Sequence, residues 1–257
     1  MTFVHLSDLH LVPPGQLAHG IDSRRLVDQV LARIRALTVQ PAFIVVSGDL
    51  SEDGSAASYE VLNEIVRDLE SDGIPVLLAL GNHDDRATFR RSVLGETTAT
   101  GQAPFHYGRT FDGIRVIMLD SVIPGETAGV LGEAQLRWLE TELNEPAPNG
   151  ALVVVHHPCR LAASETHFPD FVLGDATALE AIVARCSSRV LGVLAGHSHQ
   201  ANVAPFATSI HTTAPAVLCQ LDFFAGEKYK PVPGSGFNLC RIQDSELIAT
   251  PVLIGGE

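Results

Sequence analysis

Side chains that could bind metal ions directly follow five short apolar runs of the sequence. Aspartate and histidine offer the oxygen and nitrogen donors that divalent first-row metal ions accept, and a carboxylate can bridge two such ions. No cysteine stands at any of these positions, which excludes a structural thiolate zinc centre. Seven candidates are too many for one ion that keeps open coordination positions, and they suit two ions that share a ligand. The candidates are Asp8, His10, Asp49, Asn82, His156, His197 and His199.

Each of these residues alone has an ordinary structural explanation. A histidine at the end of a strand usually packs in the core or faces solvent, and Asp49 or Asn82 after a glycine would suit a turn. These explanations require five independent coincidences, because every cluster falls where an apolar run ends. Binding sites of open α/β sheets lie beyond the carboxyl ends of the strands, so the five clusters are predicted to converge. Gly48, Gly81 and Gly196 are expected where the backbone passes close to the ions.

The apolar runs alternate with amphipathic segments of helical period. The predicted strands are Phe3–Leu6, Ala42–Val46, Val76–Leu80, Ile114–Leu119, Ala151–Val155, Val190–Ala195, Ser209–Thr213, Val217–Phe223, Gly236–Ile242 and Leu247–Leu253. The predicted helices are Ser23–Leu37 with Ser23 as its N-cap, Ser55–Ser71, Asp85–Val93, Gly132–Leu143 and Ala176–Ala184. This alternation predicts an α/β fold, and the strand-rich C-terminal third predicts a second sheet packed against the first. No linker, charge block or repeat interrupts the pattern, so residues 1–257 are expected to form a single domain.

Composition limits the partners of this chain. Its 257 residues are 46% hydrophobic, and its formal net charge is −13 with histidine neutral. Such an acidic surface repels polyanions, which argues against a nucleic acid polymer as partner. The four cysteines, Cys159, Cys186, Cys219 and Cys240, are widely spaced and form no Cys-x-x-Cys motif. We therefore expect reduced thiols in the core of a cytoplasmic protein.

We expect a soluble protein without a targeting segment. The N-terminus enters the first apolar run without the basic stretch and apolar segment of a signal peptide. The longest uncharged stretch, Ala201–Leu221, contains Asn, Ser, His, Thr and two prolines, so it is not expected to cross a bilayer as a helix. The same stretch would supply an apolar contact between two copies, and a homodimer is therefore expected.

In order and spacing, the five clusters resemble the motif set of the calcineurin-like metallophosphoesterases. The matching runs are Asp8-x-His10, Gly48-Asp49, Gly81-Asn82-His83-Asp84, His156 and Gly196-His197-x-His199. The resemblance implies a four-layer α/β/β/α sandwich and two divalent ions, of Mn, Fe, Zn or Co, that share Asp49. Asp8, His10 and His199 would complete one ion site, and Asn82, His156 and His197 the other. His83 would face the substrate phosphate.

Within that family the sequence is most similar to bacterial class III cyclic-nucleotide phosphodiesterases and the related glycerophosphodiesterases. The similarity rests on the run HLSDLHL, on Gly20-Ile21-Asp22, and on VVSGDLSEDG and LGNHDDRATF. Three features depart from the pattern. His19 replaces an aromatic residue, Cys159 stands where a proline is common, and Thr166–Gly174 only partly matches a loop of the substrate wall.

The resemblance implies a metal-dependent phosphodiesterase that hydrolyses 3′,5′-cyclic nucleotides or glycerophosphodiesters by attack of a metal-bridging hydroxide on phosphorus. His83 is predicted to stabilise the transition state or to protonate the leaving oxygen. His19, His167 and Asp170 are candidates for the wall of the substrate pocket. The alternatives are a phosphomonoesterase, a pyrophosphohydrolase or a nuclease on the same fold, and a non-catalytic metal-binding scaffold. The intact ligand set and His83 argue against the scaffold, because binding alone does not require them.

Overall fold

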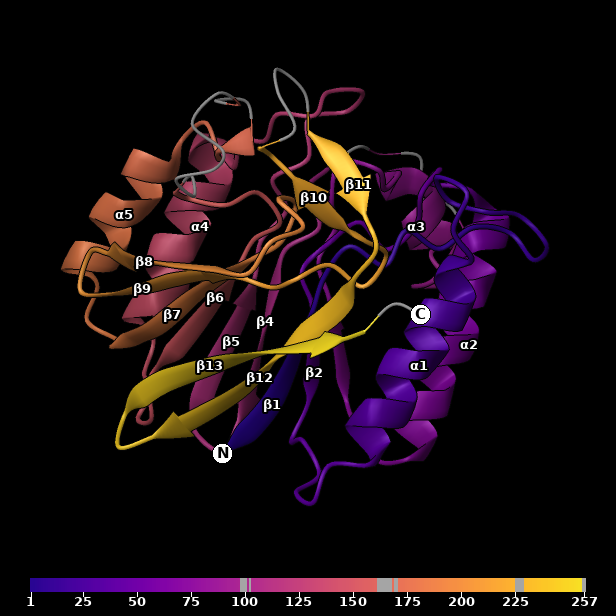
Figure 1. Cartoon of the computed structure of the whole chain (residues 1–257). Coiled ribbons are helices and arrows are strands. Elements are labelled where there is room, and N and C mark those ends of the chain that lie inside the picture. Colours follow the sequence, from indigo (N-terminus) through magenta and orange to yellow (C-terminus); the bar gives the residue numbers. More distant parts are fainter. Residues whose placement is uncertain (98–100, 102, 161–167, 169–170, 225–228, 256–257) are drawn as a thin grey trace.

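Two β-sheets pack face to face, and helices cover the outer face of each (Figure 1). This computed structural model describes residues 1–97, 101, 103–160, 168, 171–224 and 229–255. The helices over one sheet are α1 (Ser23–Arg35), α2 (Ala56–Ser71) and α3 (Arg86–Ser92), and those over the other are α4 (Gly132–Asn144) and α5 (Ala176–Arg185). The predicted four-layer α/β/β/α sandwich is confirmed.

The first sheet has five strands in the order β13-β12-β1-β2-β3. Its strands are β1 (Thr2–Leu6), β2 (Ile44–Val46), β3 (Val76–Leu78), β12 (Ser235–Gln243) and β13 (Glu246–Ile254). Strands β1, β2 and β3 run parallel, with Val4 beside Ile44 and Ile44 beside Val76. The carboxyl ends of β1, β2 and β3 therefore meet at one edge of the sheet.

The second sheet has six strands in the order β4-β5-β6-β7-β9-β8. Its strands are β4 (Tyr107–Phe111), β5 (Ile114–Met118), β6 (Ala151–Val154), β7 (Val190–Ala195), β8 (Asn202–Phe206) and β9 (Ser209–Thr213). The four inner strands run parallel, and the two edge strands are antiparallel to their neighbours. A separate two-stranded sheet, β10 (Gln220–Asp222) and β11 (Lys230–Val232), lies at the top of Figure 1.

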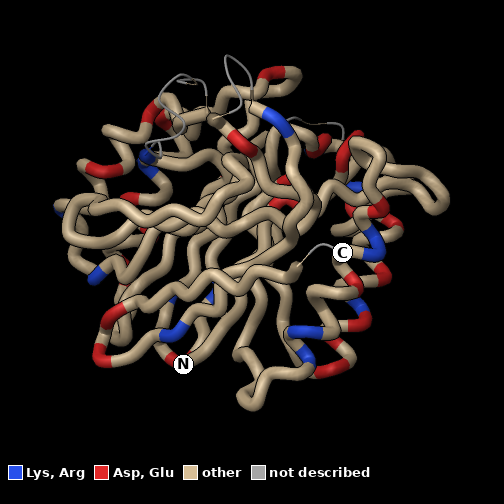
Figure 2. Tube along the Cα trace, in the orientation of Figure 1, with Lys and Arg blue, Asp and Glu red and all other residues tan. Residues whose placement is uncertain are grey.

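Three apolar clusters hold the layers together. Successive side chains of a strand point to opposite faces, so Val4 and Leu6 of β1 pack against the helices while Phe3 faces the second sheet. Between the sheets, the ring of Phe3 stacks on that of Phe43 at 4.8 Å. The charged residues fall mostly on the helices and loops, and few occur on the central strands (Figure 2). The two sheets are therefore fixed against each other by apolar contacts.

The origin of the second sheet differs from the prediction. The C-terminal hairpin β12–β13 extends the first sheet, and most of the second sheet comes from the middle of the chain. The strand predicted at Val217–Phe223 shortens to β10. Val217 and Leu218 instead donate their backbone N–H groups to the carbonyls of Ser7 and Asp8 in the loop after β1.

Local signals explain two further differences. Asp22, not Ser23, caps α1, because its side chain accepts a hydrogen bond of 3.0 Å from the backbone nitrogen of Arg25. Strand β4 was not predicted, yet Asp112 and Gly113 between β4 and β5 have φ angles of +46° and +77°. Asp-Gly is a strong signal for a two-residue hairpin turn, and it marks this hairpin in the sequence.

The cysteine prediction holds for most positions. All four cysteines are free thiols, with Cys159, Cys219 and Cys240 buried and Cys186 partly exposed. Within the described ranges, no helix is long and apolar enough to cross a membrane. Much of the uncharged stretch at 201–221 is buried in the fold. Val203 is its exposed large apolar side chain, with an exposed fraction of 64%. The contact on which the homodimer prediction rested is therefore small, and the homodimer stays a prediction.

Candidate metal centre

All seven predicted ligand candidates lie at the carboxyl ends of parallel strands, as predicted. Both sheets contribute, because their parallel strands end at the same side of the sandwich. Asp8 and His10 follow β1, Asp49 follows β2, Asn82 follows β3, His156 follows β6, and His197 and His199 follow β7. The clusters that the sequence separates by up to 191 positions thus meet in one place.

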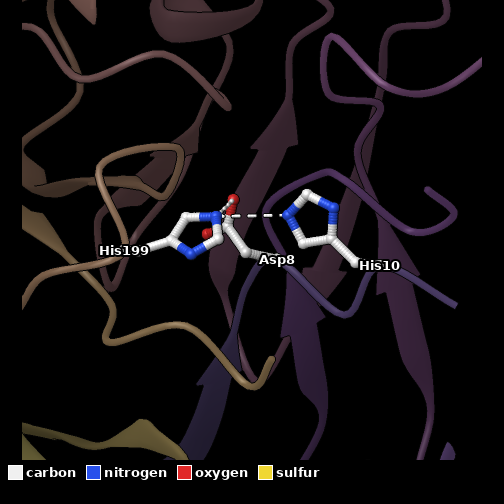
Figure 3. A group of neighbouring side chains, drawn as sticks. All are labelled: Asp8, His10 and His199. Atoms are coloured by element: carbon white, nitrogen blue, oxygen red, sulfur yellow. Dashed lines mark hydrogen bonds and ion pairs between the residues drawn. The ribbon is translucent and has the colours of Figure 1, made fainter. Parts of the chain in front are cut away.

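One group consists of Asp8, His10 and His199, whose donor atoms lie within 4.8 Å of one another (Figure 3). Nε2 of His10 lies 3.1 Å from Nε2 of His199, which lies 3.5 Å from Oδ1 of Asp8. The other nitrogen of each ring has its own acceptor: Nδ1 of His10 bonds Glu52 Oε2 at 2.6 Å, and Nδ1 of His199 bonds the carbonyl of Cys219 at 2.8 Å. When both rings are neutral, these acceptors leave a lone pair on each Nε2, and a cation between the two lone pairs would stabilise the arrangement.

A second group consists of Asp49, His156 and His197. Nε2 of His156 lies 3.3 Å from Oδ2 of Asp49 and 3.0 Å from Oδ1 of Asn82, while its Nδ1 bonds the carbonyl of Ser47 at 2.9 Å. Nε2 of His197 is buried and has no hydrogen-bond partner in the described part of the chain. A buried polar atom without a partner is costly unless a ligand or ion satisfies it, so this group fits a metal ion.

Asp49 faces both groups with the same oxygen. Its Oδ2 lies 3.3 Å from Nε2 of His156 and 3.6 Å from Nε2 of His10. Its Oδ1 accepts a hydrogen bond of 3.0 Å from the backbone nitrogen of His83, which fixes the plane of the carboxylate. The residues therefore fit two ions side by side with Asp49 between them.

Left-handed backbone conformations are concentrated at these residues. Non-glycine residues rarely have positive φ angles, and such positions are often found at functional sites. Five of the seven candidates have positive φ angles, with values from +46° to +68°. They are Asp8, His10, Asp49, His197 and His199. The tight turns after β1 and β7 each bring two candidate side chains, two positions apart in the sequence, to the centre.

Three of the glycines let the turns approach one another closely. A methyl group on Gly81 would overlap the backbone nitrogen and side chain of Asp49, and one on Gly48 would overlap the ring of His156. A methyl group on Gly196 would likewise overlap Ser7 Oγ. These positions therefore exclude any larger side chain without movement of a candidate ligand.

Burial and charge set the protonation states of the centre. Burial raises the pKa of Asp49, but His156, His10 and His83 outweigh it and hold that pKa well below its usual range. Burial lowers the pKa of His156, whereas Asp49 and Asp8 nearby raise it to about 9. Burial and repulsion from neighbouring imidazoles hold the pKa of His197 well below its usual value. His197 is thus neutral, and its Nε2 lone pair is available to a cation.

A sequence model of the calcineurin-like phosphoesterases matches residues 1–201. The chain belongs to this family. It is a metal-dependent phosphoesterase, and its two adjoining groups of candidate ligands agree with the two metal ions on which the family depends. The predicted resemblance is confirmed at this level.

Curated relatives of this phosphoesterase cover nearly all of the chain. It is 34% identical to a probable cyclic nucleotide phosphodiesterase of Rhodococcus erythropolis, over 98% of this chain and 83% of that protein. It is 30% identical to a cAMP/cGMP dual specificity phosphodiesterase of Mycobacterium tuberculosis, over 98% of this chain and 79% of that protein. A glycerophosphodiester phosphodiesterase of Enterobacter lignolyticus is 27% identical, over 87% of this chain and 80% of that protein. The predicted similarity to both groups is thus confirmed.

A solved structure shares the fold of this phosphoesterase. The crystal structure of a dimetal phosphatase from Danio rerio superposes with a TM-score of 0.70 at 17% sequence identity. The match covers 99% of this chain and 98% of that one. At this low identity the similarity concerns the sandwich alone.

His83 and His19 of the phosphoesterase lie at the edge of the centre. The ring of His83 lies 4.8 Å from that of His10, its Nδ1 bonds the carbonyl of Glu52 at 2.9 Å, and its side chain is 34% exposed. The side chain of His19 is 51% exposed, and its Nε2 lies 3.1 Å from Oε1 of Glu52. The other two candidates for the substrate wall, His167 and Asp170, lie outside the described residues.

Glu52 borders the centre and was not predicted from the sequence. Its carboxylate contacts three imidazoles, those of His10, His19 and His83. Burial raises the pKa of Glu52, but the hydrogen bond to His10 and the charges of the three rings lower it overall. The sequence signal for its role is its position: Glu52 is an acidic residue three positions after Asp49, in a loop predicted to border the centre.

Asp84 and His157 support the centre from behind. Asp84 is buried and accepts hydrogen bonds of 2.9 to 3.1 Å from the backbone nitrogens of Leu50, Ser51 and Gly81, so it ties the loops after β2 and β3 together. His157 bonds the hydroxyl of Ser121 at 2.7 Å and the carbonyl of Thr127 at 2.9 Å, and its ring packs 4.5 Å from that of His197. The described contacts of both residues are therefore structural.

Proposed function

We propose that this phosphoesterase hydrolyses small phosphodiesters, with 3′,5′-cyclic nucleotides as the first candidate and glycerophosphodiesters as the second. The observation that carries the proposal is the single oxygen of Asp49 that faces both ligand groups, 3.3 Å from His156 and 3.6 Å from His10. The names of the relatives support the substrate class, because cyclic nucleotide phosphodiesterases match over 98% of the chain.

Two ligand sets follow from this geometry. Asp8, His10, Asp49 and His199 would hold one ion, and Asp49, Asn82, His156 and His197 the other. Two ions bound here would supply Lewis-acid polarisation of the phosphoryl oxygens and activation of water at neutral pH. The donors are oxygen and nitrogen atoms, which suit Mn, Fe, Zn or Co.

His83 would assist departure of the alcohol. Because its Nδ1 donates to the carbonyl of Glu52, its Nε2 is the nitrogen that would contact a substrate. When the ring is protonated, the Nε2 proton would pass to the leaving oxygen as the phosphorus–oxygen bond breaks. A protonated ring would also stabilise charge on the phosphoryl group before that transfer.

Other reactions on this fold are less well supported. The net charge of −13 argues against a nucleic acid polymer, since the chain lacks the excess of Lys and Arg that such substrates require. A glycerophosphodiester is the second candidate, because the relative from Enterobacter lignolyticus carries that name. Phosphomonoesters and pyrophosphates remain alternatives that kinetics must separate. A cytoplasmic location and a single domain over residues 1–257 remain predictions.

The test is a panel of unlabelled substrates assayed with manganese. We expect kcat/KM for cAMP, cGMP or glycerophosphocholine to exceed that for AMP and glycerol phosphate by at least about 10-fold, since the relatives that match 98% of the chain are named for phosphodiesters. His156→Ala, purified in parallel, measures contaminating host phosphatase. Wild-type protein that cleaves monoesters faster than every diester would contradict the proposal.

A further inference from the structure

A tight hairpin turn carries His19 to the edge of the metal centre. Ala18 and Ile21 exchange two backbone hydrogen bonds, of 2.9 and 2.8 Å, so His19 and Gly20 form the turn. Their φ angles of +49° and +80° are those of a type I′ turn, whose first position usually holds asparagine, aspartate or glycine. A histidine in this conformation is uncommon, and its position next to the centre suggests a function.

The carboxylate of Glu52 lies beside the imidazole of His19. Its Oε1 lies 3.1 Å from Nε2 of His19, while its Oε2 lies 2.6 Å from Nδ1 of His10. The same Oε2 lies 3.7 Å from Nδ1 of His83. One carboxylate therefore connects the turn to a candidate metal ligand and to the candidate acid.

The other nitrogen of His19 is available to a substrate. The side chain is 51% exposed, so packing in the core does not explain its position. Its ring lies 6.4 Å from the ring of His10, at the edge of the ligand groups. The Glu52 carboxylate beside Nε2 favours the tautomer of the neutral ring that carries its proton on Nε2, which leaves Nδ1 as an acceptor. No hydrogen bond to it is formed by the residues that the structure describes, and a substrate hydroxyl group would be a suitable donor.

We propose that His19, positioned by Glu52, accepts a hydrogen bond from a hydroxyl group on the alcohol part of the phosphodiester. The inference rests on the proposed function, because it concerns the substrate of that same site. The 2′-hydroxyl of a cyclic ribonucleotide and the free hydroxyls of a glycerol ester both provide this chemistry. His19 then selects against diesters without the hydroxyl, which leave Nδ1 unpaired.

Paired deletions on the protein and on the substrate test this contact. We would measure kcat/KM for cAMP against 2′-deoxy-cAMP, and for glycerophosphocholine against ethyl phosphocholine. His19→Gly removes the imidazole and keeps the turn, because glycine adopts positive φ freely. Leu17→Ala is the matched control, since Leu17 is a 59% exposed side chain of the same loop. Glu52→Ala frees the imidazole without removing it.

Wild-type protein should prefer the hydroxylated member of at least one pair by about 3- to 10-fold, the effect of one hydrogen bond. Leu17→Ala should keep this preference, His19→Gly should lose it, and Glu52→Ala should reduce it. The pair that responds identifies whether a ribose or a glycerol hydroxyl is recognised. The inference is wrong if wild type has no preference in either pair, if His19→Gly keeps the preference, or if that variant slows both members equally. Wild-type protein that cleaves monoesters but none of the four diesters contradicts the proposed function itself, and the inference with it.

Discussion

His10, His156 and His199 turn Nε2 toward the centre because an oxygen atom holds Nδ1 from behind. The three acceptors are Glu52 Oε2 and the carbonyls of Ser47 and Cys219, at 2.6, 2.9 and 2.8 Å. Partners of this kind fix the tautomer of a metal-binding histidine and orient its ring. Two of them are backbone atoms, so any residue type can provide them. The sequence therefore could predict the ligands but not what orients them.

The role of His83 is a prediction at the same scale. His83→Ala should slow hydrolysis of a cyclic nucleotide by about 10²- to 10⁴-fold, because a strongly basic alkoxide needs a proton as it leaves. The loss on bis(p-nitrophenyl) phosphate should be much smaller, since p-nitrophenolate is a far weaker base. His106→Ala removes a histidine that packs on Trp138 at 4.3 Å and serves as the control. An equal loss on both substrates would mean that His83 acts on the phosphoryl group instead.

Among the elements, the turns after β2 and β3 determine the shape of the centre. Asp84 bonds the backbone of both turns, and Gly81 lies directly against Asp49. The turns therefore interlock, and a change in one moves a candidate ligand on the other.

Gly81→Ala tests this interlock. The added methyl group would displace Asp49, so we expect about a 10- to 100-fold loss of manganese affinity and activity, comparable with removal of a group that orients a ligand. Gly73→Ala, at the end of α2, meets no atom within 4 Å but has a φ of +79°. It should cost about 1 kcal/mol of stability and keep the metal. Calorimetric titration with manganese compares the variants, and wild-type affinity in Gly81→Ala would disprove the interlock.

Sequence patterns predicted some elements better than others, for physical reasons. Helix α2 has a long periodic signal and the buried strands β1 and β7 have mostly apolar ones, so they were predicted within one or two residues. Strands β8 and β11 were missed, because half-exposed edge strands and short strands carry little periodicity. Val217 and Leu218 have an apolar strand signal, but their backbone groups bond the loop after β1. The local sequence does not show a hydrogen-bond partner so distant along the chain, because only the tertiary structure brings the two segments together.

At the scale of the whole molecule, the centre depends on how the two sheets pack. β1, β2 and β3 of one sheet and β6 and β7 of the other bring ligands to it, and stacked rings such as Phe3 and Phe43 lie between the sheets. Convergence of the ligands could be predicted from strand polarity, since parallel strands end at one edge. The contacts of Glu52 with His10 and His19 could not, because they join loops whose relative positions only the packed sheets define.

The number of metal ions per chain tests the central claim most directly. Wild-type protein would be equilibrated with manganese and freed of unbound metal, and its content would be measured by inductively coupled plasma mass spectrometry, alongside Asp49→Ala. We expect two ions per wild-type chain and loss of both in the variant, because one oxygen of Asp49 faces both groups. One ion in the wild type, or two in Asp49→Ala, would contradict a binuclear centre that shares this carboxylate.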